Sequence, residues 1–222
     1  MSMFRVRALL SVAAALALGS CNSRPDFVAK EEPWRADEER SCLTSKVVQQ
    51  NPFVTPRSAL GGPSVCGALQ PFEMSAAVGG RVAMRPAALL RCQMVPAVDT
   101  RVSTVVQPAV RYYYGSELVE LKVAASYGCR PMNNVPGAHL SEHGHANAID
   151  ISAFVLADGR QIAVKVGYWG PPRDRAFLRS VHQGGCRMFS TVLGPEFNAA
   201  HRDHFHLDLA RHGRDGRDHF CK

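Results

Sequence analysis

Two short segments far apart in the chain constrain its fold more than any other feature. The first carries His143 and Asp150, seven residues apart, and the second carries His204 and His206, two residues apart. Residues 204–209 alternate polar with apolar side chains, which predicts a half-buried strand whose two histidines point to one face. The four side chains can act together only in a fold that brings these segments side by side.

The local sequence also predicts how the first segment folds. Gly144 disfavours a helix, whereas Ile149 and Ile151 favour a strand. We therefore expect His143 on a loop and Asp150 at the head of a strand. Two imidazole nitrogens and one carboxylate oxygen suit zinc, and they leave the fourth tetrahedral position open to water, as in a catalytic zinc site.

The first segment resembles a motif of a metallopeptidase superfamily. Ser141, His143, Ala148 and Asp150 match the Ser-x-His-x-x-Gly-x-Ala-x-Asp pattern of D-Ala-D-Ala metallopeptidases, which are grouped with lysostaphin-type endopeptidases and hedgehog-type domains. Ala146 stands where that pattern usually has glycine.

Residues 42–222 resemble more closely the bacterial domain called extensin-like C-terminal. The chain has no proline-rich extensin repeat, so this name by itself indicates no chemistry. The resemblance rests on Pro-Ala-Ala at 86–88, Val-Gln-Pro-Ala at 106–109, Ser-Tyr-Gly-Cys-Arg at 126–130, Leu-Ala-Asp-Gly-Arg at 156–160, Thr-Val-Leu-Gly-Pro at 191–195 and His-Phe-His-Leu-Asp-Leu at 204–209.

The superfamily pattern implies a role for each residue of the two segments. It makes His143, Asp150 and His206 the ligands of Zn²⁺. It makes His204 the neighbouring residue that handles a proton, a role that histidine suits at neutral pH. The implied reaction is zinc-assisted peptide hydrolysis. The implied substrate is peptidoglycan, cut by either an endopeptidase or a carboxypeptidase.

Other polar residues are candidates for neighbouring roles. His145 and His201 are alternative zinc ligands. Glu142 and Asp208 could orient ligand imidazoles, because metal-bound histidines usually need such a partner.

Three further charged residues are candidates for roles beside the metal ligands. Arg130 and Arg202 could hold a substrate carboxylate, which the planar guanidinium group matches. Glu196 precedes the histidine pair by eight residues, as an acidic base could, but its Gly-Pro setting favours a solvated loop carboxylate.

The N-terminus predicts export. Residues 1–20 contain two arginines and then a short apolar run, as in a secretory signal peptide. Leu-Gly-Ser-Cys at 18–21 resembles a bacterial lipobox, so we expect Cys21 to carry a lipid that holds the protein on a membrane facing the periplasm, with the outer membrane favoured. We expect residues 21–41 to form a flexible tether and residues 42–222 to form one domain.

The remaining cysteines support the same compartment. An even number of widely spaced cysteines in an exported chain predicts three disulfides, with 15 connectivities open. Cys66, Cys92 and Cys129 could instead be partly free. The six cysteines are Cys42, Cys66, Cys92, Cys129, Cys186 and Cys221.

The coarse secondary structure predicts an α+β fold, with a small antiparallel sheet that carries the zinc site, flanking helices and disulfide staples. We expect a helix opening at Pro86, with a break at Pro96, and a second helix starting at Pro108. Residues 173–183 predict another helix.

A strand is expected at residues 117–125. A hairpin is expected at 149–166, around Asp158-Gly159, whose sequence favours a type I′ turn.

The net charge and the absence of certain motifs disfavour several classes of function. The formal net charge of +7 suits an anionic envelope, and the signal sequence disfavours nucleic acid as a partner. The chain lacks the G-x-S-x-G elbow of serine hydrolases, and no glutamate follows His143 and His145 as a cupin-type oxidase requires. We expect a monomeric zinc peptidase acting on peptidoglycan. The alternative is a non-catalytic lipoprotein domain that docks on the cell wall.

Overall fold

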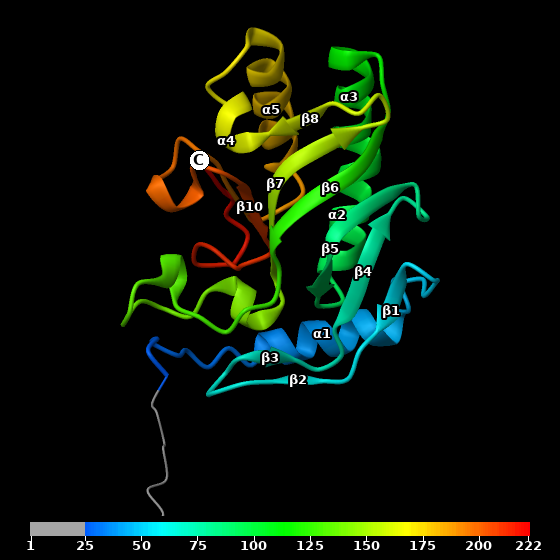
Figure 1. Cartoon of the computed structure of the whole chain (residues 1–222). Helices are drawn as coiled ribbons and strands as arrows, with labels where there is room; N and C mark the ends of the chain where they lie inside the picture. Colours follow the sequence, from blue (N-terminus) through cyan, green and yellow to red (C-terminus); the bar gives the residue numbers. More distant parts are fainter. Residues whose placement is uncertain (1–24) are drawn as a thin grey trace, which may run out of the picture.

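The computed structural model describes residues 25–222, which fold as an α+β domain built on one mixed sheet (Figure 1). The α+β class is confirmed, but the sheet is larger than the small antiparallel one expected. The predicted signal peptide and Cys21 lie outside the described residues. In spatial order the strands are β1 (Val54–Pro56), β4 (Phe72–Ala77), β5 (Val82–Leu90), β6 (Leu118–Ala125), β7 (Ala148–Leu156), β10 (Phe205–Asp208), β9 (Thr191–Leu193) and β11 (Phe220–Cys221), and β8 (Gln161–Ala163) also pairs with β7.

Most neighbouring strands are antiparallel, but β5 with β6 and β9 with β11 are parallel. A separate two-stranded sheet joins β2 (Leu60–Gly61) to β3 (Gly67–Ala68). The helices are α1 (Trp34–Ser45), α2 (Met94–Arg101), the π-helical turn η1 (Val102–Val106), α3 (Gln107–Tyr114), α4 (Val164–Gly167) and α5 (Pro172–Gly185), with short 3₁₀ turns η2 (Met132–Asn134), η3 (Glu142–His145) and η4 (Ala199–His201).

The helical unit between β5 and β6 accounts for their parallel pairing, because parallel neighbours need a long crossover. α2, η1 and α3 follow one another without a gap and lie against one face of the sheet (Figure 1). Val98, Val102 and Val106 recur every four residues and are buried in the core. This spacing places the three valines on one face of the helical unit.

The start of this helix was predicted wrongly. Pro86, Leu89 and Leu90 belong to β5, where Pro86 falls in the irregular part of the β4–β5 pairing. A proline is tolerated there because no ladder hydrogen bond needs its missing N–H. Pro96 does not break the helix, since it lies in the first turn of α2, and Pro108 lies in the first turn of α3 as expected.

The strand and hairpin predicted in the middle of the chain are confirmed. β7 and β8 pair antiparallel around Asp158 and Gly159. The turn is not of type I′, because Gly159 has a positive φ of 86° but Asp158 does not. The second strand is shorter than expected, because α4 begins directly after Ala163. The helix expected at 173–183 is α5.

The predicted tether is wrong over its described part. Phe27 is buried, and Val28 bonds to Ala138 through its backbone N–H. α1 then begins at Trp34 and crosses the lower end of the sheet (Figure 1). Within residues 25–222, no helix has both the length and the apolar character that crossing a bilayer requires.

All three expected disulfides are present. Cys42 on α1 is bonded to Cys92 after β5, Cys66 to Cys129, and Cys186 to Cys221. The alternative with free thiols at 66, 92 and 129 is therefore wrong.

Candidate metal centre

Strand alternation separates the core of the protein from a polar site. On β7, Ile149 and Ile151 are buried in the hydrophobic core, so Asp150 between them points to the opposite face. On β10, Leu207 packs in the same core and His206 points away from it. His206 lies directly opposite Asp150 in the β7–β10 pairing, which places both side chains on the same face.

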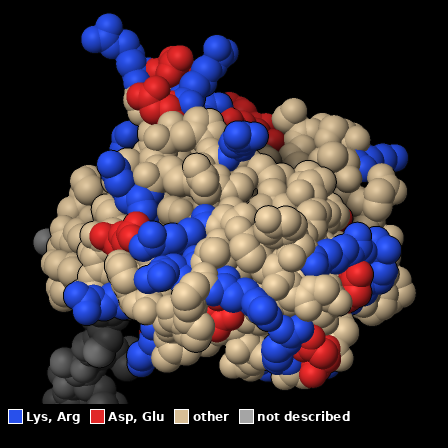
Figure 2. Space-filling model, turned by 90° about the horizontal axis from the view of Figure 1, so that it is seen from above, with Lys and Arg blue, Asp and Glu red and all other residues tan. Residues whose placement is uncertain are grey.

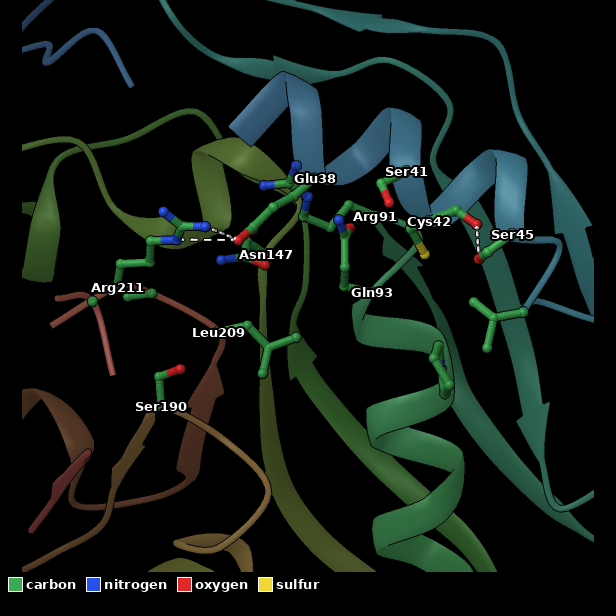
Figure 3. Close-up of a pocket in the computed structure, with 14 residues that line it drawn as sticks. Glu38, Ser41, Cys42, Ser45, Arg91, Gln93, Asn147, Ser190, Leu209 and Arg211 are labelled. Carbon is green, nitrogen blue, oxygen red and sulfur yellow. Dashed lines mark hydrogen bonds and ion pairs between the residues drawn. The ribbon is translucent and has the colours of Figure 1, made fainter. Parts of the chain in front are cut away.

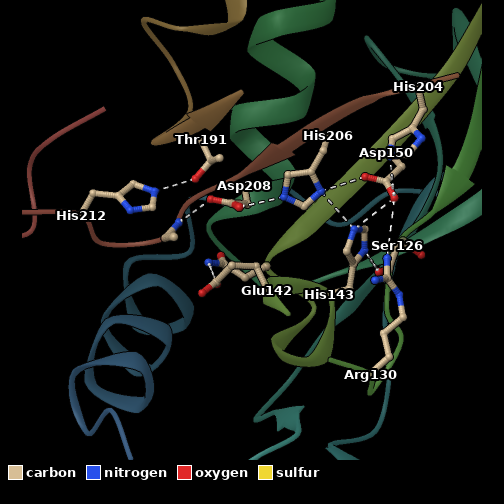
Figure 4. A network of polar contacts seen from close by, with 12 residues as sticks. Ser126, Arg130, Glu142, His143, Asp150, Thr191, His204, His206, Asp208 and His212 are labelled. Atoms are coloured by element: carbon tan, nitrogen blue, oxygen red, sulfur yellow. Dashed lines mark hydrogen bonds and ion pairs between the residues drawn. The ribbon is translucent and has the colours of Figure 1, made fainter. Parts of the chain in front are cut away.

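His143 completes a compact group with these two residues (Figure 4). His206 Nδ1 is 2.9 Å from Asp150 Oδ1, and His143 Nε2 is 3.1 Å from Asp150 Oδ2. The two ring nitrogens are 3.2 Å apart. The predicted convergence of His143, Asp150 and His206 is confirmed, and all three side chains are buried.

Hydrogen bonds on the outer sides of both rings fix where their protons lie. His143 Nδ1 donates to the carbonyl oxygen of Ser126. His206 Nε2 donates to Asp208 Oδ2 at 2.8 Å. In the neutral tautomers that these contacts favour, His143 Nε2 and His206 Nδ1 carry the ring lone pairs, and both face the carboxylate of Asp150. Three acceptors around one point need a cation between them.

The electrostatics of the group agree with this reading. Burial raises the pKa of Asp150, but the adjacent imidazoles of His143 and His206 outweigh it and hold that pKa well below its usual range. Burial lowers the pKa of His206, but the carboxylates of Asp150 and Asp208 outweigh it and raise that pKa to about 9. The centre of the group therefore stabilises a positive charge, which either a proton or a metal ion can supply.

The spacing of the donor atoms fits zinc. Two ligands about 2.0–2.1 Å from a tetrahedral zinc ion lie about 3.3 Å from each other. The ring nitrogens of His143 and His206 are 3.2 Å apart, close to that value. Each nitrogen also lies beside a different oxygen of Asp150, with His206 Nδ1 2.9 Å from Oδ1 and His143 Nε2 3.1 Å from Oδ2. The outer hydrogen bonds to Ser126 and Asp208 are those that ligand imidazoles need to keep their tautomer and orientation.

The group opens into a cavity of about 340 Å³. His204 lies at its edge, with Nε2 3.6 Å from Asp150 Oδ2 and Nδ1 donating to Asp203 Oδ1 at 2.8 Å. Arg130, in the segment between β6 and η2, also lines the cavity, and its Nη2 is 4.0 Å from Asp150 Oδ2. Both predicted neighbours of the ligands therefore reach the site.

His201 also lines the cavity, but it is not one of the converging ligands. Its Nδ1 donates to Asn198 Oδ1 at 2.7 Å, and its ring centroid is 5.3 Å from that of His204. Burial, with the nearby positive charges of His206 and His204, lowers the pKa of His201 to about 4. This wall of the cavity is thus a neutral imidazole.

His212 also lines the cavity, where its Nε2 lies 2.7 Å from Thr191 Oγ1. No motif in the sequence indicates this pair, which the segment after β10 brings together.

Several other predicted residues do not reach the site. Arg202 is exposed outside the cavity lining, and Glu196 pairs with Arg179 on the surface at 3.0 Å. His145 lines a different hollow beneath α1, where burial, helped by nearby arginines, lowers its pKa to about 4. Glu142 does not orient a ligand imidazole, because its carboxylate accepts hydrogen bonds from Arg35 and Asn147 instead.

Those groups hold the turn that carries His143. Arg35 on α1 binds Glu142 through two hydrogen bonds of 2.8 and 2.5 Å, and Asn147 Nδ2 donates to the same carboxylate at 2.6 Å. Ala146 closes the turn in the left-handed region, with φ of 51°, a conformation that glycine adopts with least strain. The turn expected from the glycine pattern therefore forms with alanine.

A larger hollow, of about 570 Å³, lies between α1 and the core (Figure 3). Its lining includes Glu38, Arg91, Asn147 and Arg211, and it contains no histidine. Arg211 reaches across it to Glu38 on α1. These polar groups hold the helix to the domain, so the smaller cavity with the histidines is the candidate site despite its size.

Comparison with known proteins gives one match. The profile of a family described as "Extensin-like protein C-terminus" matches residues 40–222. No curated protein and no solved structure matches the chain. The match thus covers α1 from its middle onward, the whole sheet and every residue of the metal centre.

Proposed function

The chain belongs to the extensin-like C-terminus family, and from that premise we propose that it is a zinc-dependent peptidase that cuts the stem peptides or cross-links of peptidoglycan. The superfamily of D-Ala-D-Ala metallopeptidases and lysostaphin-type endopeptidases is part of the same proposal, because the motif around His143 and Asp150 resembles theirs.

One observation carries the proposal. The inner ring nitrogens of His143 and His206 and the carboxylate of Asp150 converge at the wall of a cavity. A structural zinc site is closed by four protein ligands, whereas a catalytic site keeps one position open. Three protein ligands beside a cavity correspond to the catalytic arrangement.

The side chains around the ligands supply the remaining chemistry. A bound zinc ion would polarise the substrate carbonyl and make a water molecule acidic. His204 Nε2, 3.6 Å from Asp150 Oδ2, is placed to take a proton from that water and return it to the leaving amine. Asp203 holds the ring of His204 through Nδ1. Arg130 is placed to bind the carboxylate or the developing negative charge of the substrate.

The location forms part of the proposal. Three disulfides favour an oxidising compartment, and the leader sequence favours export with a lipid on Cys21. We therefore place the protein in the periplasm, on the outer membrane, as a monomer. Peptidoglycan is the polymer it would meet there.

The proposal is tested by digestion of purified sacculi with the mature protein. We expect soluble peptide fragments from the zinc-loaded protein, none after chelation, and recovery when zinc is restored. His204→Ala should reduce release about 100-fold or more, as expected for loss of a general acid and base. His139→Ala is the matched control, because His139 is an exposed histidine outside the cavity.

Two results would overturn the proposal. Sacculi that stay intact with zinc-loaded, folded protein would favour a docking domain without catalysis. Equal release by wild type and His204→Ala would remove the proposed proton transfer.

A further inference from the structure

A second surface, beside the cavity, has the composition of a binding site. We define the α4 ridge as Lys165, Val166, Trp169, Arg173 and Arg175, on α4, the start of α5 and the turn between them. Val166 is 69 % exposed and Trp169 is 56 % exposed, and the two are three residues apart in the chain. The three cationic side chains are exposed around them.

The three cations of the ridge form no ion pair with an acidic side chain of the described residues, and Asp174, between Arg173 and Arg175, accepts a hydrogen bond from Tyr114. On this side of the described chain, Arg179 pairs with Glu196 and Arg160 pairs with Asp158. The cations of the ridge take no part in these pairs. Figure 2, which shows the end of the molecule that carries α3, α4 and α5, has Lys and Arg side chains spread across an otherwise mostly uncharged surface.

A series of contacts links the ridge to the metal cavity. Tyr168, next to Trp169, is buried under the guanidinium group of Arg179, which lies 5.5 Å from the centre of its ring. Arg179 in turn holds Glu196 at 3.0 Å, and the next residue, Phe197, lines the cavity. A substrate long enough to follow these residues from the metal centre would reach the ridge.

We propose that the α4 ridge binds a glycan strand that carries carboxylate groups, as an extension of the substrate site. The face of an indole ring accepts the apolar face of a sugar, while its N–H remains free to bond. Lysine and arginine beside it match the carboxylates by charge. Only two large apolar side chains protrude here, which is little for insertion into a bilayer. The choice of a peptidoglycan strand rests on the proposed function.

Binding to sacculi, measured with chelated and therefore non-hydrolysing full-length protein, tests this inference. Trp169→Ala and Lys165→Glu/Arg173→Glu should each weaken binding at least about fivefold. Tyr112→Ala and Lys46→Glu/Arg81→Glu are the matched controls, because they change an exposed aromatic and two exposed cations elsewhere. These controls should bind as wild type does.

Hydrolysis measured in parallel separates this inference from the proposed function. We expect Trp169→Ala to digest sacculi more slowly but to cut a soluble stem-peptide fragment at the wild-type rate. Reduced binding without hydrolysis of any substrate by the zinc-loaded wild type would support the ridge and overturn the proposed function.

Three results would overturn the ridge as a glycan site. One is that Trp169→Ala and Lys165→Glu/Arg173→Glu bind sacculi as tightly as the wild type does. The second is an equal loss of binding in the controls. The third is binding of the wild type to vesicles of anionic phospholipid that Trp169→Ala abolishes while sacculus binding stays unchanged, which would assign the ridge to a membrane.

Discussion

Asp208→Asn tests the metal centre without touching a ligand. Both carboxylate oxygens of Asp208 accept hydrogen bonds: Oδ2 from His206 Nε2 at 2.8 Å and Oδ1 from the backbone N–H of Ala210 at 2.9 Å. Asparagine has the same shape but only one acceptor, so it cannot satisfy both donors. Either His206 or Ala210 must lose its partner.

The structure indicates which bond is lost. If the asparagine NH₂ group faced Ala210, two buried donors would oppose each other at a cost of about 1–3 kcal/mol. If it faced His206, the ring would lose its acceptor at Nε2 and would hold a single proton on Nδ1, where Asp150 Oδ1 accepts it at 2.9 Å. The second arrangement satisfies every group in the metal-free protein. It also covers with a proton the nitrogen that must bind the metal.

We therefore expect Asp208→Asn to fold normally and to bind zinc about 10–100-fold more weakly, the usual effect of losing such an outer hydrogen bond. This corresponds to about 1.4–2.8 kcal/mol. Competition with a chromophoric chelator measures the affinity, and circular dichroism with thermal melting in chelator checks the fold. Asp37→Asn, at an exposed aspartate of α1, is the control. Wild-type zinc affinity in folded Asp208→Asn would refute the tautomer argument.

Three further predictions concern stability, measured by urea unfolding in chelator. Arg35→Met should cost about 3–5 kcal/mol, because it leaves the buried carboxylate of Glu142 without its ion-pair partner. Replacing Cys66 and Cys129 with alanine should cost up to about 4 kcal/mol, since their disulfide closes a loop of 63 residues. Burial lowers the pKa of His182, so the unfolded chain binds the proton more tightly, and wild type should lose more stability than His182→Gln as pH falls through about 6.5.

Each of these has a result that contradicts it. Arg40→Met removes an exposed ion pair and should cost less than about 1 kcal/mol; an equal loss in Arg35→Met would mean that the α1 contact is dispensable. Reduced and oxidised wild type of equal stability would contradict the disulfide prediction. A pH dependence that is the same with and without His182 would show that this histidine is not buried as a neutral ring.

The sequence predicted that Asp150 and His206 point away from the core because strand alternation is a short-range property. Asp150 lies between two buried isoleucines, and His206 lies between Phe205 and Leu207, so each polar side chain had one available face. What the sequence could not show was the pairing that places β10 beside β7. Only the resemblance to a metallopeptidase motif suggested it.

The partners that orient the ligands were harder to predict. Asp208 was recognised because it lies two residues from His206, but the partner of His143 is a backbone carbonyl, that of Ser126, which no pattern of side chains can indicate. Glu142 was misassigned because it is adjacent to His143. Its actual partner, Arg35, lies 107 residues earlier in the chain.

The same long-range pairing explains why the described part of the tether was misjudged. A cluster of charged residues with few large apolar side chains normally indicates a segment that cannot bury enough surface to fold. Here three ion pairs join the segment to the rest of the domain: Arg35 pairs with Glu142, Glu39 with Arg91 and Glu38 with Arg211. Cys42 adds a covalent link to the end of β5 through Cys92. Residues 25–41 thus belong to the domain, because they include Arg35, which holds the turn on which His143 lies.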